Sequence, residues 1–501
     1  MTEADAWLIA YPDQFGPDGL GSVGEVVDAL SPGINGVHVL PFHPSSSDGG
    51  FAVQDYDVVD PAFGSWEDVT ALATRHRLMA DAVINHVSAQ GTWFGEWLSG
   101  DPNRDGYFRA VPGDADLGAV VRPRPGAPTV GLRRGGDAVD VWATFGPDQV
   151  DLDYRTPAVL LDVVRALLKY VEHGAHAIRL DAVAYLWKEP GRASIHEPET
   201  HSLVAILRSV LDDIDPGIVL ITETNVPHVD NVAYFGTAAA READAVYQFP
   251  LAPLMLHAVQ TGDTRPIVSW LRSVDPPENG TFLNFLASHD GVGVRPARGW
   301  LSDAQIDELA QRCRSVGGVV NEASTADGAE PYELAATWFS LCGAGVDEQM
   351  AQARHAASHA VMLALVGVPL LYAHSLTMAV NDVGRASASG SGRDLNRGRY
   401  ASPVHFLGEV AGSSAGSTIG ALLESRRRTT AFDPASMQQV LEAPEGVVAI
   451  ERASEDERSL VVVNLRDTPV QVEIGDGWRF AVTDRPIYPV LALPPYGVFW
   501  S

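Results

Sequence analysis

Acidic and histidine side chains stand at the ends of four apolar runs of the sequence. Asp181 and Glu223 each end one run, His289 and Asp290 follow a third, and His86 follows a fourth. A carboxylate about 5–5.5 Å from a second carboxyl group can act as a nucleophile beside a general acid, as in glycosidic bond cleavage with retention. If the four ends converge, these residue types predict nucleophilic and acid–base chemistry.

Arg179 lies two residues before Asp181 in a strand-like run, so the two side chains are expected to share a face. An adjacent guanidinium favours the ionised carboxylate, and we expect it to depress the pKa of Asp181, as a nucleophile requires. A purely structural ion pair is the alternative. Glu223 ends an apolar run, where burial raises the pKa of a carboxyl group and suits it to act as a general acid. Its alternative is a charge at a helix N-terminus.

The two histidine segments allow further interpretations. His289 and Asp290 could hold a metal, hydrogen-bond a substrate, or simply form a polar turn. No second His or Cys lies at ligand spacing, so no metal site is predicted. His86 could equally be an ordinary histidine at the rim of the fold.

Eight short apolar runs alternate with helical patterns and are predicted to be strands. Several are continuous Val, Ile, Leu and Ala stretches, which is typical of strands buried on both faces. The pattern predicts a (β/α)8 TIM barrel, in which the carboxyl ends of the strands share the face that holds active sites. A doubly wound sheet is the alternative, but no run is followed by G-x-G-x-x-G. The runs are 7–11, 36–40, 78–84, 175–182, 218–223, 245–249, 282–288 and 369–373.

The clearest predicted helix spans 157–173, with Thr156 as N-cap and Pro157 at the first helical position. A second helix is expected after Ser65. We expect the apolar face of the first helix to consist of Leu160, Leu161, Val164, Leu167, Leu168 and Val171.

Two connections are too long for simple loops, and they predict insertions over the catalytic face. Beyond residue 435 short alternating runs, including 480–482, predict a small all-β domain. The expected division is 1–86, 156–290 and 337–435 for the barrel, 87–155 and 291–336 for the insertions, and 436–501 for the C-terminal domain.

Composition limits the possible partners and compartment. Lys and Arg number 35 and Asp and Glu 64 among 501 residues, giving a net charge of −29. Such an acidic surface argues against nucleic acid and anionic membranes as partners. Cys313 and Cys342 are too few for a disulfide scaffold and fit a reducing compartment. With no basic leader and no apolar run of about 18 residues, a cytoplasmic protein is expected.

Taken in order, four segments resemble the signature regions of the α-amylase superfamily of glycoside-active enzymes. They are Asp81 to His86, Arg179-Leu180-Asp181, Glu223 and His289-Asp290. The resemblance implies Asp181 as nucleophile, Glu223 as general acid and base, and Asp290 as stabiliser of the transition state. It implies that His86, Arg179 and His289 hold the donor sugar and the nucleophile.

Further segments resemble the sucrose-phosphorylase branch of that superfamily. They are Ser47 to Phe51, Tyr185 to Gly191, Arg122-Pro123-Arg124 and Arg393 to Arg397. In that branch an Asp and an Arg close the far end of the donor site, and Asp48 and Arg397 match them. Phe51 would be an apolar platform under the sugar, or else an ordinary packing aromatic.

Within the branch, the segments 290–296 and 194–201 are more similar to the glucosylglycerate and glucosylglycerol phosphorylases. Glu333 stands where the sucrose enzymes have Gln, and it is expected to bind substrate. Ala335 and Ala336 stand where relatives usually have Asn and a small or β-branched residue, and 386–391 is only Ala, Ser and Gly. Both departures should lie near the acceptor site, so the sequence does not determine which acceptor is used.

The resemblance implies a retaining glycoside phosphorylase that moves an α-glucosyl unit between a small glucoside and phosphate, giving α-glucose 1-phosphate. Phosphate and acceptor would need fixed cations, and we expect Arg124, Arg295 and Tyr332 at their site. The alternatives are a sucrose phosphorylase, an α-glucosidase or transglucosidase, and a catalytically silent sugar-binding protein. No cofactor or metal is expected, and the chain would be a monomer or homodimer. Further candidate cations are Arg122, Arg133, Arg134 and Arg298.

Overall fold

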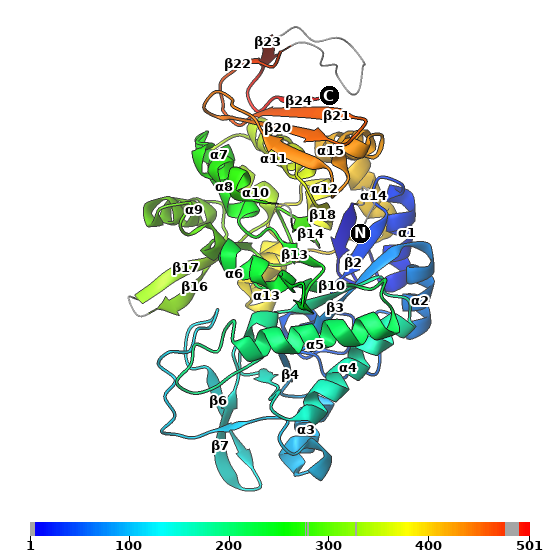
Figure 1. The fold of residues 1–501 in the computed structure, drawn as a ribbon, viewed down its shortest axis with the longest axis vertical. Coiled ribbons are helices and arrows are strands. Elements are labelled where there is room, and N and C mark those ends of the chain that lie inside the picture. Colours follow the sequence, from blue (N-terminus) through cyan, green and yellow to red (C-terminus); the bar gives the residue numbers. More distant parts are fainter. Residues whose placement is uncertain (1–5, 276, 278–279, 326–327, 476–489) are drawn as a thin grey trace.

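A closed barrel of parallel strands occupies the centre of the computed structural model, which describes residues 6–275, 277, 280–325, 328–475 and 490–501 (Figure 1). The eight strands pair in chain order around the ring, and each of the eight predicted runs overlaps one of them. The (β/α)8 prediction is therefore confirmed, and the doubly wound alternative is wrong. The strands are β1 (Trp7–Ala10), β2 (Gly36–Val39), β3 (Arg77–Val83), β9 (Ala177–Asp181), β10 (Val219–Thr222), β13 (Ala245–Tyr247), β14 (Thr281–Asn284) and β18 (Val368–Tyr372).

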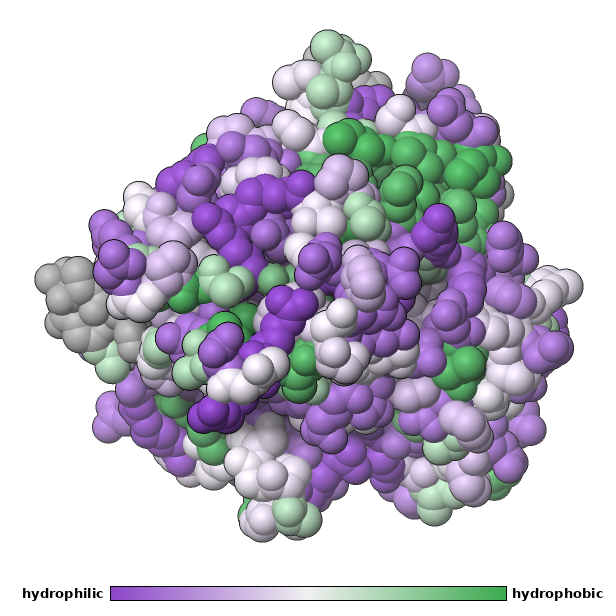
Figure 2. Space-filling model, turned by 90° about the horizontal axis from the view of Figure 1, so that it is seen from below, coloured by the Kyte–Doolittle hydropathy of each residue, from purple (hydrophilic) through white to green (hydrophobic). Residues whose placement is uncertain are grey.

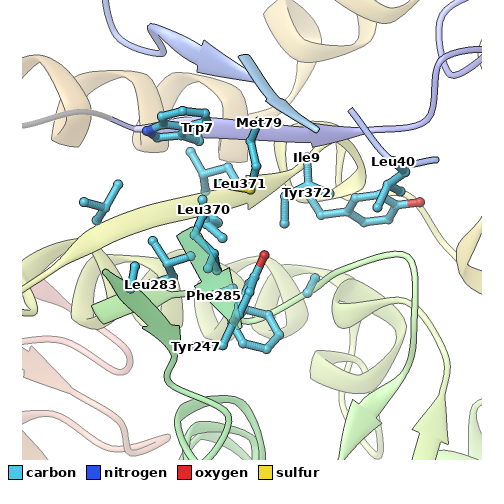
Figure 3. Close-up of a cluster of buried hydrophobic side chains, with 14 of the residues drawn as sticks. Trp7, Ile9, Leu40, Met79, Tyr247, Leu283, Phe285, Leu370, Leu371 and Tyr372 are labelled. Carbon is cyan, nitrogen blue, oxygen red and sulfur yellow. The ribbon is translucent and has the colours of Figure 1, made fainter. Parts of the chain in front are cut away.

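Large apolar side chains fill the barrel. Figure 3 shows Trp7 and Ile9 of β1 facing Leu370 of β18 and Leu283 of β14, and all four are at most 2% exposed. Because a Cβ at Gly36 would lie 2.4 Å from the Trp7 ring, only glycine fits at the start of β2. This packing fixes the strand ends that position the site.

Helices surround the barrel, and local sequence explains their starts. Ser65 begins α2 with a capping box, in which its hydroxyl accepts from the Asp68 amide while Asp68 accepts from the Ser65 amide. The helices between or after barrel strands are α1 (Leu20–Leu30), α2 (Trp66–Arg75), α4 (Pro157–Glu172), α5 (Pro198–Ile214), α6 (His228–Val232), α7 (Leu251–Thr261), α8 (Arg265–Ser273), α10 (Trp338–Cys342), α11 (Glu348–Ala364), α12 (Ala373–Thr377), α13 (Val383–Ser389), α14 (Pro403–Gly412) and α15 (Ser414–Arg427).

The predicted apolar face of α4 is wrong in part. The helix buries Val159, Val163, Ala166, Leu167 and Tyr170 against the barrel, whereas Leu161 is 57% exposed. The helix is apolar on more than one side, so periodicity alone did not identify the buried side.

Figure 2 views the molecule from below and shows one compact apolar area on an otherwise mostly hydrophilic face.

The first insertion leaves the barrel after β3 and returns at α4. Its strands form two small sheets, β4 with β8 and β5-β7-β6. Because it follows the carboxyl end of a barrel strand, it extends over the face where the predicted site residues lie. Its elements are β4 (His86–Ser88), α3 (Thr92–Ser99), β5 (Ala110–Val111), β6 (Thr129–Arg134), β7 (Asp137–Trp142) and β8 (Gln149–Asp151).

The second insertion follows β14 and forms a roof beside the first. It consists of β15 (Val292–Gly293), α9 (Asp303–Ser315) and the hairpin of β16 (Val319–Thr325) with β17 (Gly328–Ala335). The three strands form one sheet in the order β15-β17-β16. The hairpin projects from the body of the molecule in Figure 1.

The C-terminal part is all β in the residues described. One sheet has the order β19-β20-β21-β24, and β22 pairs with β23. The predicted strand 480–482 lies outside the described residues. The strands are β19 (Met437–Val440), β20 (Val447–Ala453), β21 (Arg458–Asn464), β22 (Val470–Glu473), β23 (Val490–Leu493) and β24 (Val498–Trp500). Within the described ranges, no helix is both long and apolar enough to span a membrane.

Candidate active site

Two acidic side chains meet at the ends of neighbouring barrel strands. Asp181 ends β9, and Glu223 directly follows β10, which pairs with β9. One nitrogen of Arg179 lies 3.1 Å from Asp181 Oδ1 and the other 3.9 Å from Glu223 Oε2. Ala182 adopts a left-handed conformation (φ 50°), and its amide donates to Glu223 Oε2 at 3.0 Å. The sharp turn after β9 thus fixes both carboxyl groups on one guanidinium.

A second pair of contacts holds Arg179 itself. Its Nη1 donates to Asp81 Oδ1 at 2.6 Å, and His38 Nε2 lies 3.0 Å from the other Asp81 oxygen. Asp81 is 1% exposed. These partners come from β2 and β3, so three adjacent strands orient the guanidinium.

The pKa of Asp181 differs from the expectation. Burial raises the pKa of both Asp181 and Glu223, and Arg179 lowers each only in part. The expected net depression at Asp181 is therefore wrong, because the desolvation of a buried carboxylate outweighs one cation. Arg179 donates to Asp181 and the Ala182 amide donates to Glu223, so each carboxyl group has one donor that favours its ionised form against the effect of burial.

Asp290 approaches the same space from beyond β14. Its Oδ1 lies 2.8 Å from Arg393 Nη1 and 3.6 Å from Arg397 Nη2. The Asn396 amide donates to the Asp290 carbonyl oxygen at 2.6 Å, which fixes the loop. His289 stacks on the Phe51 ring at 4.8 Å between centroids and 9° between planes. Burial and nearby arginines lower the pKa of His289 well below its ordinary value, so this imidazole is neutral.

Asp48 and Arg397 meet at one end of the site. Arg397 Nη2 lies 3.2 Å from Asp48 Oδ1, and the arginine is 1% exposed. Burial opposes ionisation of Asp48, but Arg393 and Arg397 hold its pKa below the ordinary value. Gly49 has φ 63°, and a Cβ there would lie 2.7 Å from Arg397 Nη1. Glycine therefore allows this ion pair to close.

His86 is held by one group from the connection after β2 and one from the first insertion. Its Nε2 lies 2.9 Å from the Phe51 carbonyl oxygen and 3.1 Å from Gln149 Nε2. Behind it, Lys188 donates to Asn85 Oδ1 at 2.7 Å and lies 3.5 Å from Asp151. Lys188 and Asp151 have side chains that are 4% and 0% exposed.

Replacing Lys188 with methionine should lower the free energy of unfolding by about 3–5 kcal/mol, because Asp151 would keep a buried charge without its cation. The measurement is urea unfolding at neutral pH. Lys169→Met is the control, since Lys169 pairs with the exposed Asp57 and such surface pairs contribute about 0–1 kcal/mol. Equal losses in the two variants would contradict the assigned role of Lys188.

These groups line one pocket at the carboxyl ends of the barrel strands. Eight of the predicted site residues line it, and Arg179 and Arg397 support it from behind. The lining residues are Asp48, Phe51, His86, Phe145, Gln149, Asp181, Ala182, Tyr185, Glu223, Thr224, Asn225, His289, Asp290, Tyr332 and Arg393. We call this pocket the donor cavity.

Glu333 does not line the donor cavity. Both of its carboxylate oxygens accept from Arg393, at 3.1 and 2.8 Å, and Asn321 donates to one of them at 2.8 Å. The side chain is 2% exposed. Glu333 therefore holds Arg393 against Asp290, and it links the roof hairpin to the site.

The predicted cations divide between two clefts. Arg124 lines a cleft of about 530 Å³ that also includes Asp48 and Arg393, and Arg295 lines another. Neither side chain forms an ion pair with the described residues. In contrast, Arg134 pairs with Asp105, and Arg133 donates to the Gly136 carbonyl oxygen.

Sequence reasoning missed Arg393, Gln149, Asn225 and Tyr185 as lining residues. Arg393 and Tyr185 stand in segments that resemble the sucrose-phosphorylase branch, so a signal existed for them. Gln149 and Asn225 have no sequence signal, because only the folded insertion and the turn after β10 bring them to the cavity. Among the described residues, no group of three or more His, Cys, Asp or Glu side chains could hold a metal ion.

Comparison with known proteins agrees with this geometry. The family description "Alpha amylase, catalytic domain" matches residues 23–290. A glucosylglycerate phosphorylase of Spirochaeta thermophila is 42% identical over 93% of this chain and 81% of its own length. A sucrose phosphorylase of Bifidobacterium adolescentis is 29% identical over 85% of this chain and 86% of its own.

A crystal structure of sucrose 6F-phosphate phosphorylase from Thermoanaerobacter thermosaccharolyticum has the same fold. It superposes with a TM-score of 0.82 at 23% identity, covering 93% of this chain and 95% of that one. The barrel, the ordered motifs and these relatives lead to one assignment. The chain belongs to the α-amylase superfamily, in the branch of the sucrose and glucosylglycerate phosphorylases.

Proposed function

We propose that the protein is a retaining glycoside phosphorylase that transfers an α-glucosyl unit between glucosylglycerate and phosphate. The observation that best supports the chemistry is the carboxyl pair, Asp181 and Glu223, fixed on Arg179 at the wall of the donor cavity. The 42% identity to a glucosylglycerate phosphorylase supports glycerate as the acceptor.

In the first step an Asp181 oxygen attacks the anomeric carbon of the glucosyl unit. The bond from that carbon to the glycerate oxygen breaks, and Glu223 gives its proton to the departing oxygen. Arg179 hydrogen-bonds Asp181 and orients it for the attack, while Asp290 faces the positive charge that develops on the sugar. The products are a β-glucosyl ester of Asp181 and free glycerate.

In the second step a phosphate oxygen attacks the same carbon from the opposite face. Glu223, now a carboxylate, accepts the proton of the attacking phosphate hydroxyl, and Asp181 leaves. Two inversions give α-glucose 1-phosphate with net retention. The reverse sequence makes glucosylglycerate.

The closed end of the donor cavity explains why one glucosyl unit is transferred. Asp48 and Arg397 would hydrogen-bond the sugar hydroxyl opposite the anomeric carbon, and their ion pair leaves no passage for a longer chain. Phe51 and His289 would contact the ring faces and edges. Starch-like chains are therefore excluded as donors.

Product analysis tests the proposal. The enzyme is incubated with glucosylglycerate in phosphate buffer, and α-glucose 1-phosphate and free glucose are measured separately. We expect glucose 1-phosphate to dominate and its anomeric signal to be α by NMR. Mainly free glucose would identify a glucosidase, and faster turnover of sucrose would identify a sucrose phosphorylase. No product from any donor would identify a silent sugar-binding protein.

Arg124 is the residue we propose for phosphate, because it stands at the mouth of the site beside Asp48 and has no acidic partner in the described chain. Arg124→Gln should raise the KM for phosphate roughly 10- to 100-fold, the equivalent of one charge-assisted hydrogen bond. Arg133→Gln, in the same insertion but exposed on a hairpin, should leave it unchanged. An unchanged KM in both variants would remove Arg124 from the phosphate site.

We also infer a cytoplasmic location. Cys313 and Cys342 are both free and buried, which suits a reducing compartment.

A further inference from the structure

A second cleft lies beside the donor cavity, between the two insertions. It measures about 620 Å³, and its walls include Val121, Arg122, Arg295, Arg298, Glu330 and Tyr332. Tyr332 lines both this cleft and the donor cavity. The cleft therefore begins where the space for the glucosyl unit ends.

The cleft is cationic in a strongly acidic protein. Arg122, Arg295 and Arg298 face a single acid, Glu330, although the chain has a net charge of −29. Two of the three arginines are already engaged. Arg122 donates to the Thr144 carbonyl oxygen at 3.0 Å, and Arg298 pairs with Glu330 at 2.5 Å.

Arg295 is the arginine that is left for a ligand. Its side chain has no hydrogen bond or ion pair with any residue in the described ranges. A guanidinium fixed without an acidic partner attracts anions, and its planar donors match a carboxylate. By contrast, Arg298 pairs with Glu330, and Arg122 donates to two backbone carbonyl oxygens.

The backbone places Arg295 firmly next to Tyr332. β15 pairs with β17, and the Val294 amide then donates to the Tyr332 carbonyl oxygen at 3.0 Å. Pro296 and Ala297, directly after Arg295, are buried. The side chain therefore leaves the backbone from a fixed point at the border of the donor cavity.

The positive charge of Arg295 acts electrostatically on Tyr185, a residue of the donor cavity. Burial raises the pKa of Tyr185, which lines the donor cavity, to about 12, and Arg295 opposes that rise while Glu223 adds to it. Arg295 and Glu223 thus act on the same hydroxyl. A small acceptor next to Glu223 is within the electrostatic reach of Arg295.

His196 adds a polar group near Arg295. Its Nδ1 lies 3.0 Å from the Tyr234 hydroxyl, whereas its buried Nε2 has no partner among the described groups. Burial lowers the pKa of His196 to about 4, and Arg295 contributes to that shift. The residue also adopts a left-handed conformation (φ 54°), a strain that proteins retain mainly at functional sites.

We propose that this second cleft binds the carboxylate of a hydroxy-acid acceptor through Arg295, separately from the phosphate site at Arg124. The inference rests on the proposed function, because it names the part of the acceptor that the enzyme recognises. The acceptor hydroxyl faces Glu223, the carboxylate extends past Tyr332, and Arg295 holds it. Neutral polyols of the same size lack the group that Arg295 binds.

Arg295→Gln tests this assignment in the synthesis direction. The variant is given α-glucose 1-phosphate with either D-glycerate or glycerol, and phosphate release is followed. The KM for glycerate should rise roughly 10- to 100-fold, whereas kcat/KM for glycerol should stay within about 2-fold. Arg295→Lys should recover part of the glycerate affinity, because it restores the charge without the planar fork.

Phosphate binding is measured separately, with α-glucosyl fluoride as a neutral donor. Arg295→Gln should leave the KM for phosphate unchanged, unlike Arg124→Gln. Arg312→Gln is the control from the same insertion, since Arg312 pairs with Glu308 on the outer side of α9. Retained turnover of glycerol shows that the variant is folded.

The outcomes separate this inference from the proposed function. Equal losses with glycerate and glycerol, an unchanged KM for glycerate, or a raised KM for phosphate would overturn the role of Arg295 alone. A wild-type enzyme that ignores glycerate but uses fructose would contradict the proposed acceptor and this inference together.

Discussion

Asp181→Asn should reduce turnover roughly 10⁴- to 10⁶-fold with every acceptor, the loss typical when a nucleophile is removed. The amide keeps the shape of the side chain but cannot form the glucosyl ester. The measurement is phosphate release from α-glucose 1-phosphate with D-glycerate. The loss should fall on kcat, because the donor cavity and its Asp48–Arg397 end stay intact.

An external nucleophile gives the decisive control for Asp181. Asp181→Gly with azide and α-glucosyl fluoride should form the β-glucosyl azide, because azide would attack from the face that the carboxylate left. Asp307→Asn, on the exposed side of α9, should behave as wild type. Near-wild-type turnover in Asp181→Asn would overturn the nucleophile assignment and with it the mechanism.

Glu223→Gln should lower kcat/KM for glucosylglycerate about 10²- to 10⁴-fold, because glycerate would leave without a proton. The same variant should react with α-glucosyl fluoride at a nearly normal rate in the first step, since fluoride departs without protonation. Comparing the two donors in a stopped assay separates acid catalysis from general damage. Glu424→Gln, a surface change on α15, is the matched control.

The pH dependence follows from the same residue. Glu223 must be protonated to act as the acid, and burial raises its pKa above the ordinary value. The first step should therefore persist to higher pH than an ordinary glutamate allows, and it should fall as pH rises through that raised pKa. With α-glucosyl fluoride this alkaline limb should be absent, and an identical limb for both donors would contradict the role of Glu223.

The barrel could be predicted because its strands are continuous apolar runs, each of which overlaps a strand in the structure. The helix start after Ser65 was equally local, and the structure shows that a capping box forms there. The buried face of α4 could not be predicted, because the sequence of a helix that is apolar on several sides does not show which side the barrel covers. Contacts with distant segments determine the buried face, and they leave Leu161 exposed.

The site shows the same division. Residues at strand ends, such as Asp181 and Glu223, were predictable because the topology brings strand ends together. The ion-pair partner of Glu333 could not be predicted, since Arg393 lies 60 positions away along the chain. The pKa of Asp181 also required the structure, because the cost of burial cannot be judged from the neighbouring arginine alone.

The ion pair between Arg393 and Glu333 affects how substrates reach the active site. The Arg393 guanidinium, in the segment after α13, joins Glu333 of the hairpin to Asp290, so lifting the hairpin would separate the buried Glu333 from its cation. Separating such a buried pair costs about 3–5 kcal/mol, so on the order of one molecule in 10³ would stand open at any moment. Substrates and products should then enter and leave through the clefts beside the donor cavity, without movement of the hairpin. The size and charge of the cleft openings would select which molecules enter. Turnover would need no large rearrangement of the chain.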